Sequence, residues 1–104
     1  MGEQISFADF LLSIAQDASP PGKLGLALKA LWHDRRGDWG QAHELAQKTM
    51  GKDGSWVHAY LHRREGDATN ADYWYRLTGR APSQNGLDEE WAQIAKALLN
   101  EADD

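Results

Sequence analysis

The sequence predicts an all-α protein of about six short helices, stacked as antiparallel helical hairpins and closed by a C-terminal capping helix. A six-residue phrase, HDRRGD at residues 33–38, returns as HRREGD at residues 62–67. The offset of 29 residues also superposes two pairs of alanines, Ala30 on Ala59 and Ala42 on Ala71. Recurring units of this size are typical of stacked helix–turn–helix elements. No segment alternates apolar and polar residues with a period of two, so we expect no sheet.

The first predicted helix is short and is followed by a proline break. Apolar residues at positions 7, 10, 11 and 14 recur with helical spacing, and Ser6 can cap the first turn. Pro20 and Pro21 then interrupt the chain, because proline lacks a backbone donor and restricts the residue before it. We expect a loop within one domain at this break.

The repeated phrase reads mainly as the end of one helix and the start of the next. A second helix is predicted over residues 23–36, and Gly37 suits the left-handed position that follows a helix. Arg35 and Arg36 suit the negative end of the helix dipole, and Asp38 suits the N-cap of the third helix. The second copy repeats these roles, so only the two histidines of the phrase have no required structural role.

The middle of the chain contains three further predicted helices. We expect a third helix over residues 39–50 and a turn at residues 52–54. A fourth helix is expected to be capped by Ser55 and ended by Gly66. A fifth helix is expected to start at Asp67 or Thr69 and to end at Gly79. A loop follows over residues 80–86, where proline, serine and asparagine gather.

The last predicted helix has the clearest amphipathic stripe in the chain. Its apolar residues are Leu87, Trp91, Ile94, Ala95 and Leu98. If the stripe folds back onto the hairpins, the helix is the cap that a terminal repeat requires. If it faces outward, the chain forms a homodimer, so we expect a monomer or a weak homodimer.

Composition fits one domain over residues 1–104 and excludes several functional classes. The chain has no cysteine, which rules out a disulfide framework and a thiolate metal site. No apolar run is long enough to span a membrane, and a cytoplasmic location is expected. Residues 1–87 hold ten acids and ten bases, and the acidic excess lies in residues 88–104. This distribution argues against nucleic acid as a partner, which calls for clustered positive charge.

Residues 59–79 resemble tetratricopeptide repeats and their Sel-like relatives. The matching residues are Gly66-Asp67 at the turn, Ala71, the triplet Trp74-Tyr75-Arg76, and Gly79. The segment from Asn70 to Arg80 also resembles a small bacterial family of unassigned function that carries NAxYWYRxxGR. These resemblances imply a helical-repeat fold with a binding surface, and they imply no activity. The offset of 29 residues is shorter than the 34 of standard tetratricopeptides.

Two histidines have the spacing of metal ligands. His58 and His62 stand at i and i+4, so both rings project from one face of the fourth helix. A zinc site needs a third ligand, for which His33 is our candidate, with His43 or Asp34 as the alternatives. The other interpretation is that these rings sit at the edge of an aromatic core and bind no metal, and we expect no cofactor.

Arginines and aromatic residues around the second copy of the phrase form a candidate ligand site. Arginine beside aromatic rings can hold a carboxylate, a phosphate or a stacked base. The candidate residues are Arg63, Arg64, Trp74, Arg76 and Arg80. The alternative is that the aromatic rings belong to the core and the arginines form surface ion pairs.

The sequence therefore favours a non-catalytic module that binds a protein or peptide in the groove between its hairpins. The chain contains no nucleophile elbow, phosphate loop, dinucleotide-binding glycine pattern or calcium loop, so an enzymatic role has no strong anchor. The second hypothesis is a small metal-dependent enzyme or hydrolase that uses a histidine cluster.

Overall fold

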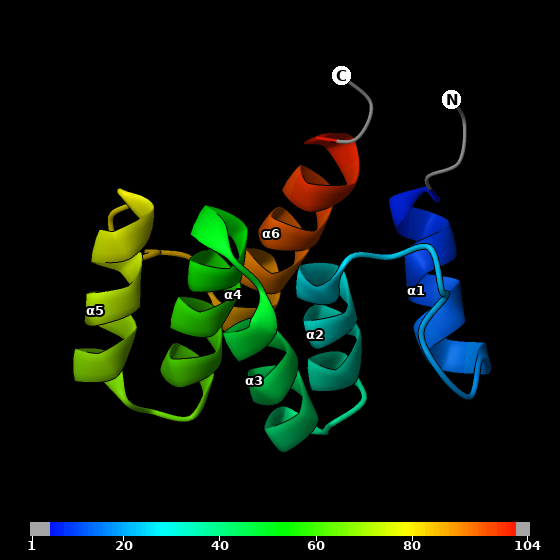
Figure 1. Ribbon diagram of the computed structural model, residues 1–104, viewed down its shortest axis with the longest axis horizontal. Coiled ribbons are helices and arrows are strands. Elements are labelled where there is room, and N and C mark those ends of the chain that lie inside the picture. The colour runs from blue at the N-terminus through cyan, green and yellow to red at the C-terminus, as the bar shows by residue number, and fades with distance from the viewer. Residues whose placement is uncertain (1–4, 102–104) are drawn as a thin grey trace.

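The computed structural model describes residues 5–101, and within that range it contains six α-helices and no strand. The helices are α1 (Phe7–Gln16), α2 (Leu26–Arg35), α3 (Trp39–Lys48), α4 (Gly51–Arg64), α5 (Ala68–Thr78) and α6 (Leu87–Glu101), as Figure 1 shows. The all-α prediction is confirmed. Among the described residues, no helix combines the length and the apolar character needed to cross a membrane.

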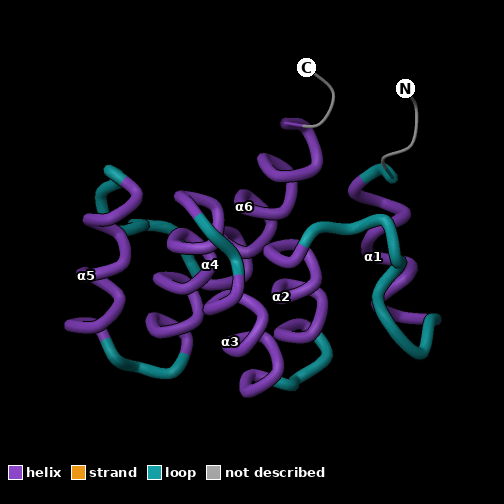
Figure 2. The backbone as a smooth tube through the Cα atoms, in the orientation of Figure 1, coloured by secondary structure: helices purple, strands orange, loops and turns teal. Residues whose placement is uncertain are grey.

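Helix α4 occupies the centre of the molecule. It packs against α5 on one side and α3 on the other, and it also contacts α2 and α6. All seven residues from 56 to 62 are buried, although four of their side chains carry a polar atom. Figure 2 shows the short connections that join α2 to α3 and α4 to α5 at the same end of the molecule. Any site built on α4 is therefore bounded by its neighbours.

The two copies of the repeated phrase form the same turn. Gly37 and Gly66 adopt φ values of 87° and 89°, a backbone region that favours glycine because it has no Cβ. The next residue in each copy is the N-cap: the side chain of Asp38 accepts from the backbone N–H of Gln41, and that of Asp67 accepts from Asn70. The glycine and aspartate roles predicted from the sequence are confirmed.

The arginines of the first copy connect different helices. Arg35 Nη1 lies 3.2 Å from Asp88 Oδ1 on α6, and its guanidinium lies 4.2 Å from the centre of the Trp91 ring. Arg36 donates to the carbonyl oxygens of Ile14 (3.0 Å) and Asp17 (2.6 Å), at the C-terminal end of α1. Arg36 therefore interacts with the negative end of the α1 dipole and not with that of α2, because its long side chain extends beyond the turn.

The predicted boundary between the third and fourth helices is wrong. Residues 52–54 belong to α4 and form no separate turn, and Ser55 lies inside the helix instead of capping it. A glycine occurs inside α4 at this point because the preceding residue Thr49 lies close to the helix. A Cβ on Gly54 would stand 2.6 Å from the carbonyl oxygen of Thr49, so glycine at this position serves packing and does not break the helix. The second helix also begins later than predicted, with Gly25 as its N-cap.

Aromatic side chains from five helices fill the core. The largest fully buried side chains include Trp32, Trp91, Tyr60, Tyr75 and Phe10. The stripe of α6 faces this core: Trp91 and Ile94 are fully buried, and the indole N–H of Trp91 donates to the carbonyl of Leu31 (3.0 Å). The stripe of α6 therefore packs inward, and the helix contacts α1, α2 and α4. Leu11, which belongs to the helical apolar pattern at residues 7, 10, 11 and 14, is 41% exposed and lies outside this core.

Candidate functional site

Three histidines meet where α3 packs on α4, and we call His43, His58 and His62 the histidine cluster. Each offers a ring nitrogen, and these three nitrogens lie within 4.8 Å of one another. The Nε2 atoms of His43 and His58 are 2.8 Å apart, and one ring donates to the other. His58 and His62 are buried, whereas His43 is partly exposed. Two helices thus bring together three groups that are separated by up to 19 positions in the chain.

Two tryptophans enclose the histidine cluster. Trp39 stacks on His43 with ring centres 4.7 Å apart, and Trp74 stacks on His58 at 3.9 Å. The indole N–H of Trp39 donates to the carbonyl of Leu61 at 2.8 Å, which fixes that ring relative to α4. Flat ring contacts on both sides restrict rotation of the imidazoles. The cluster is therefore a preorganised group of rings.

The surroundings of His43 and His58 favour uncharged imidazole. The pKa of His58 is lowered to about 4, mainly by burial and to a smaller extent by the neighbouring His43 and His62. Burial also lowers the pKa of His43, followed in size by the effect of His62. The Nδ1 atom of His62 lies 2.8 Å from Oε2 of Glu65. At neutral pH His43 and His58 therefore offer imidazole lone pairs.

His33 does not join the other histidines. Its ring lies against Trp32, with centres 5.1 Å apart and planes at 72°. The third member of the cluster is His43, which the sequence offered only as an alternative. Trp39 and His43 stand at i and i+4 on α3, as His58 and His62 do on α4, so each pair lies on one face of its own helix. The packing of α3 on α4 brings the two faces together.

The five residues of the predicted arginine site separate into different environments. Arg63 contacts Glu90, Arg64 lies 3.2 Å from Asp34, and Arg80 covers the ring of Trp56. Arg76 is exposed on α5, and Trp74 belongs to the wall of the histidine cluster. The structure thus brings only Arg63 and Arg80 close to one pocket.

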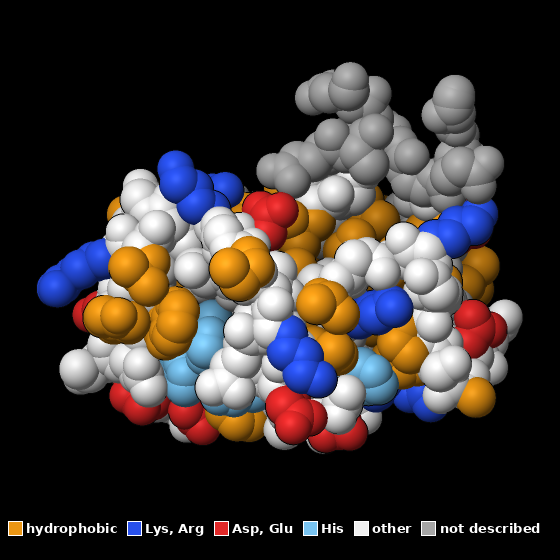
Figure 3. Space-filling model, viewed as in Figure 1, with side chains coloured by type: hydrophobic (Ala, Val, Ile, Leu, Met, Phe, Trp, Pro, Cys, Tyr) orange, Lys and Arg blue, Asp and Glu red, His pale blue; other side chains and the backbone are white. Residues whose placement is uncertain are grey.

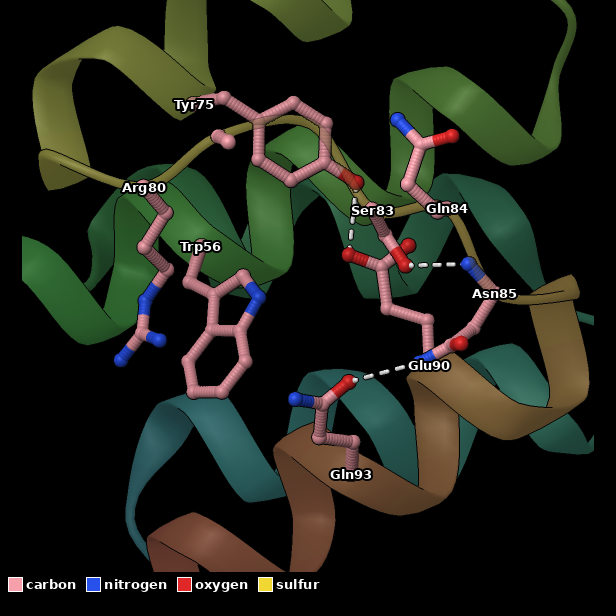
Figure 4. A pocket seen from close by; sticks show the side chains of 9 residues that line it. Trp56, Tyr75, Arg80, Ser83, Gln84, Asn85, Glu90 and Gln93 are labelled. Carbon is pink, nitrogen blue, oxygen red and sulfur yellow. Dashed lines mark hydrogen bonds between the residues drawn. The ribbon is translucent and has the colours of Figure 1, made fainter.

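That pocket, of about 420 Å³, lies between α4, α6 and the loop that follows α5. We call it the loop pocket, and Figure 4 shows its lining. Its walls are Trp56, Tyr75, Arg80, Ala81, Ser83, Gln84, Asn85, Glu90 and Gln93. The guanidinium of Arg80 lies 3.5 Å from the centre of the Trp56 ring, which gives the pocket a cationic and aromatic edge.

A buried carboxylate forms the inner wall of the loop pocket. Glu90 is 1% exposed; its Oε2 accepts from the hydroxyl of Tyr75 and its Oε1 from Arg63 Nη1, both at 2.6 Å. Burial raises the pKa of Tyr75, and the hydrogen bond to Glu90 raises it further, so this hydroxyl stays protonated. Arg63 also donates to the carbonyl of Asn85, which holds the loop against α4. The charge of Glu90 is thus compensated before any ligand arrives.

Sequence reasoning missed most of the loop pocket. Gln84, Asn85 and Gln93 carry no motif, and the loop is placed by the contact between Arg63 and Asn85 across 22 positions. No protein-family model, curated protein or solved structure matches the chain. The chemistry of the two sites therefore rests on their own geometry.

Proposed function

We propose that the protein is a non-catalytic module that binds a short segment of a partner protein, with the loop pocket holding a carboxylate of that segment. The observation that carries this proposal is the guanidinium of Arg80 stacked on Trp56 at the pocket edge. Among the described residues, Arg80 has no carboxylate partner, so its donors can meet a ligand. A volume of about 420 Å³ suits one or two side chains of a peptide.

The polar lining of the pocket supports a peptide as the ligand. Gln84, Asn85 and Gln93 offer amide groups that can pair with a peptide backbone, and Trp56 offers an apolar face. Charge-assisted hydrogen bonds from arginine to a carboxylate are among the stronger polar contacts. An acidic side chain or a C-terminal carboxylate is therefore the group that the pocket selects.

The proposal includes the finer architecture, in which the pairs α2/α3 and α4/α5 are two repeat units of the tetratricopeptide type. Its support is that both pairs turn at a glycine of the same φ and restart at an aspartate cap. Modules of this type bind segments of other proteins. A cytoplasmic location for the module is also proposed, because the chain contains no cysteine.

The test is selection from a library of random displayed peptides, followed by titration of the enriched peptides while the NMR signals of Trp56 and Arg80 are observed. We expect enriched peptides to carry aspartate, glutamate or a free C-terminus. Arg80→Gln is expected to weaken binding about tenfold or more, since a hydrogen bond to a charged group contributes roughly 1.5–3 kcal/mol.

The matched control is Arg76→Gln, which removes an exposed arginine of α5 outside the pocket lining. We expect this variant to bind as the wild type does. The proposal is overturned if no peptide is enriched, or if enriched peptides bind both variants equally well.

The second hypothesis, a metal-dependent hydrolase, is favoured only by the histidine cluster. Its first requirement is that the cluster binds a metal ion, and metal analysis of protein purified without a tag measures this directly. Protein that neither retains nor takes up metal would exclude the hydrolase.

A further inference from the structure

The histidine cluster has the chemistry of a metal site although it lies apart from the proposed peptide pocket. Three imidazoles converge, and each offers a ring nitrogen within 4.8 Å of those of the other two. A hydrogen bond between two imidazoles uses one lone pair and leaves the remaining nitrogens of the cluster to other partners. The three ring nitrogens therefore form a group that a metal ion could bind.

We propose that His43, His58 and His62 bind one divalent transition-metal ion of the zinc type, and that Glu65 orients His62. Imidazole is a preferred ligand for zinc, copper and nickel, whereas magnesium and calcium prefer oxygen ligands. Three protein ligands leave a fourth tetrahedral position for water or an exogenous ligand. This proposal is independent of peptide binding at the loop pocket.

The distances fit this ion after small movements. Zinc–nitrogen bonds of about 2.0–2.1 Å in a tetrahedral site place neighbouring ligand nitrogens roughly 3.3 Å apart. The Nε2 atoms of His43 and His58 are 2.8 Å apart, so this pair must open by about half an ångström. No spacing between the three ligand nitrogens exceeds 4.8 Å. His43 is partly exposed, and a shift of its ring within its own plane keeps the stacking on Trp39 while it supplies a movement of this size.

Metal binding breaks the hydrogen bond between the rings of His43 and His58. Metal binding needs a lone pair on each coordinating nitrogen, so the ring that donates in the metal-free protein must take the other tautomer. No net proton is lost when a neutral ring changes tautomer. The pair therefore exchanges one weak mutual bond for two bonds to the ion.

Glu65 has the position of an orienting group for His62. Its Oε2 lies 2.8 Å from Nδ1 of His62, which favours the tautomer with the proton on Nδ1 and the lone pair on Nε2. Metal-binding histidines commonly donate their second N–H to a carboxylate in this way. Glu65 is thus a positioning residue and His62 the ligand.

An ion can reach the histidine cluster from solvent. Figure 3 shows histidine side chains, in pale blue, reaching the surface in the half of the molecule built by α4 and α5. His43 is the partly exposed member and lies on α3, at the edge of the cluster. The rings of Trp39 and Trp74 stack on His43 and His58, so the approach from solvent is at the exposed part of His43.

A competing arrangement shares one histidine with the cluster. His62, Glu65 and Asp67 also bring three ligand atoms within 4.8 Å of one another. Asp67, however, already caps α5 by accepting from Asn70, and Glu65 is exposed. The two arrangements differ in the residues that they need: His43 and His58 for the first, and Asp67 for the second.

The test is isothermal titration calorimetry of zinc chloride into chelator-treated protein that carries no histidine tag. We expect one zinc ion per chain. His43→Gln is expected to weaken the affinity at least tenfold, and His33→Gln, which changes a histidine outside the cluster, is the matched control and is expected to bind within twofold of the wild type. Glu65→Gln is expected to weaken binding roughly tenfold, as loss of an outer-sphere partner does.

Two further measurements keep the outcome clear if a variant unfolds. Circular dichroism of each variant establishes folding, and cobalt in place of zinc gives visible absorption bands that report tetrahedral coordination in the wild type. The proposal is overturned if equimolar zinc does not bind the wild type, or if His43→Gln binds zinc normally. It is likewise overturned if Asp67→Asn abolishes zinc binding while His43→Gln retains it, because the ion then sits at the competing site.

Discussion

Replacing Arg63 by methionine tests the buried charge at the loop pocket. Methionine keeps the apolar stem but removes the charge that faces Glu90, which is only 1% exposed. Removing one partner of a buried ion pair costs about 3–5 kcal/mol, because the other charge stays buried. Arg63 is partly exposed and Tyr75 continues to donate to Glu90, so we take the lower end, about 3 kcal/mol. This is a large share of the roughly 5–15 kcal/mol that stabilises a typical domain.

The assay is urea unfolding of Arg63→Met, Glu90→Gln and the double variant, observed by tryptophan fluorescence and circular dichroism. Glutamine keeps an acceptor for Tyr75 and removes the charge, so the double variant is expected to be more stable than Arg63→Met alone by about 2 kcal/mol. Arg76→Met, on the exposed face of α5, is the control and is expected to change stability by less than about 0.5 kcal/mol. A loss below about 1 kcal/mol for Arg63→Met, or no recovery in the double variant, refutes the reasoning.

Three other outcomes are expected. Gly37→Ala and Gly66→Ala are each expected to lower the free energy of unfolding, measured in urea, by about 1–2 kcal/mol, because both positions have positive φ. Gly22→Ala in the first loop is the control and is expected to change it little. Unequal losses at the two turns would contradict their equivalence. The pKa of His58 is lowered to about 4, so in metal-free protein the unfolded chain takes up this proton near pH 6.5 and the folded chain only near pH 4. Stability is then complete above pH 6.5 and falls by up to about 3 kcal/mol toward pH 4, and a flat profile would show that His58 is accessible to protons. Arg36→Ala removes the donors to the end of α1, so hydrogen exchange is expected to accelerate in α1 and not in α4; equal acceleration in both would mean that α1 is held elsewhere.

Helix ends were the most predictable part of the fold, because their signals are local. Gly66 and Asp67 act on residues within a few positions, so their roles follow from backbone conformation and hydrogen bonding alone. The same logic failed at Gly54, where glycine serves a contact with Thr49. A glycine that permits close packing and one that ends a helix look alike in a sequence.

The candidate sites were less predictable, because each joins residues that are distant in the chain. The i, i+4 spacing placed His58 and His62 on one face of α4. Whether His33 on α2 or His43 on α3 joins them depended on how these helices pack against α4. Arg63 and Arg64 are adjacent in sequence yet contact α6 and α2, respectively. Long, flexible side chains can reach several partners, and helix propensity does not determine which partner a given arginine contacts.

The sequence by itself determined the all-α class, the two glycine turns with their aspartate caps, and the amphipathic stripe of α6, whereas the direction in which that stripe faces was left to the tertiary structure. These features follow from interactions between neighbours in the chain and from the period of the helix. The tertiary structure alone decided that His43 completes the histidine cluster, that Arg80 covers Trp56 and that Glu90 is buried between Arg63 and Tyr75. Those contacts depend on how helices pack, and packing is a property of all the side chains at an interface together.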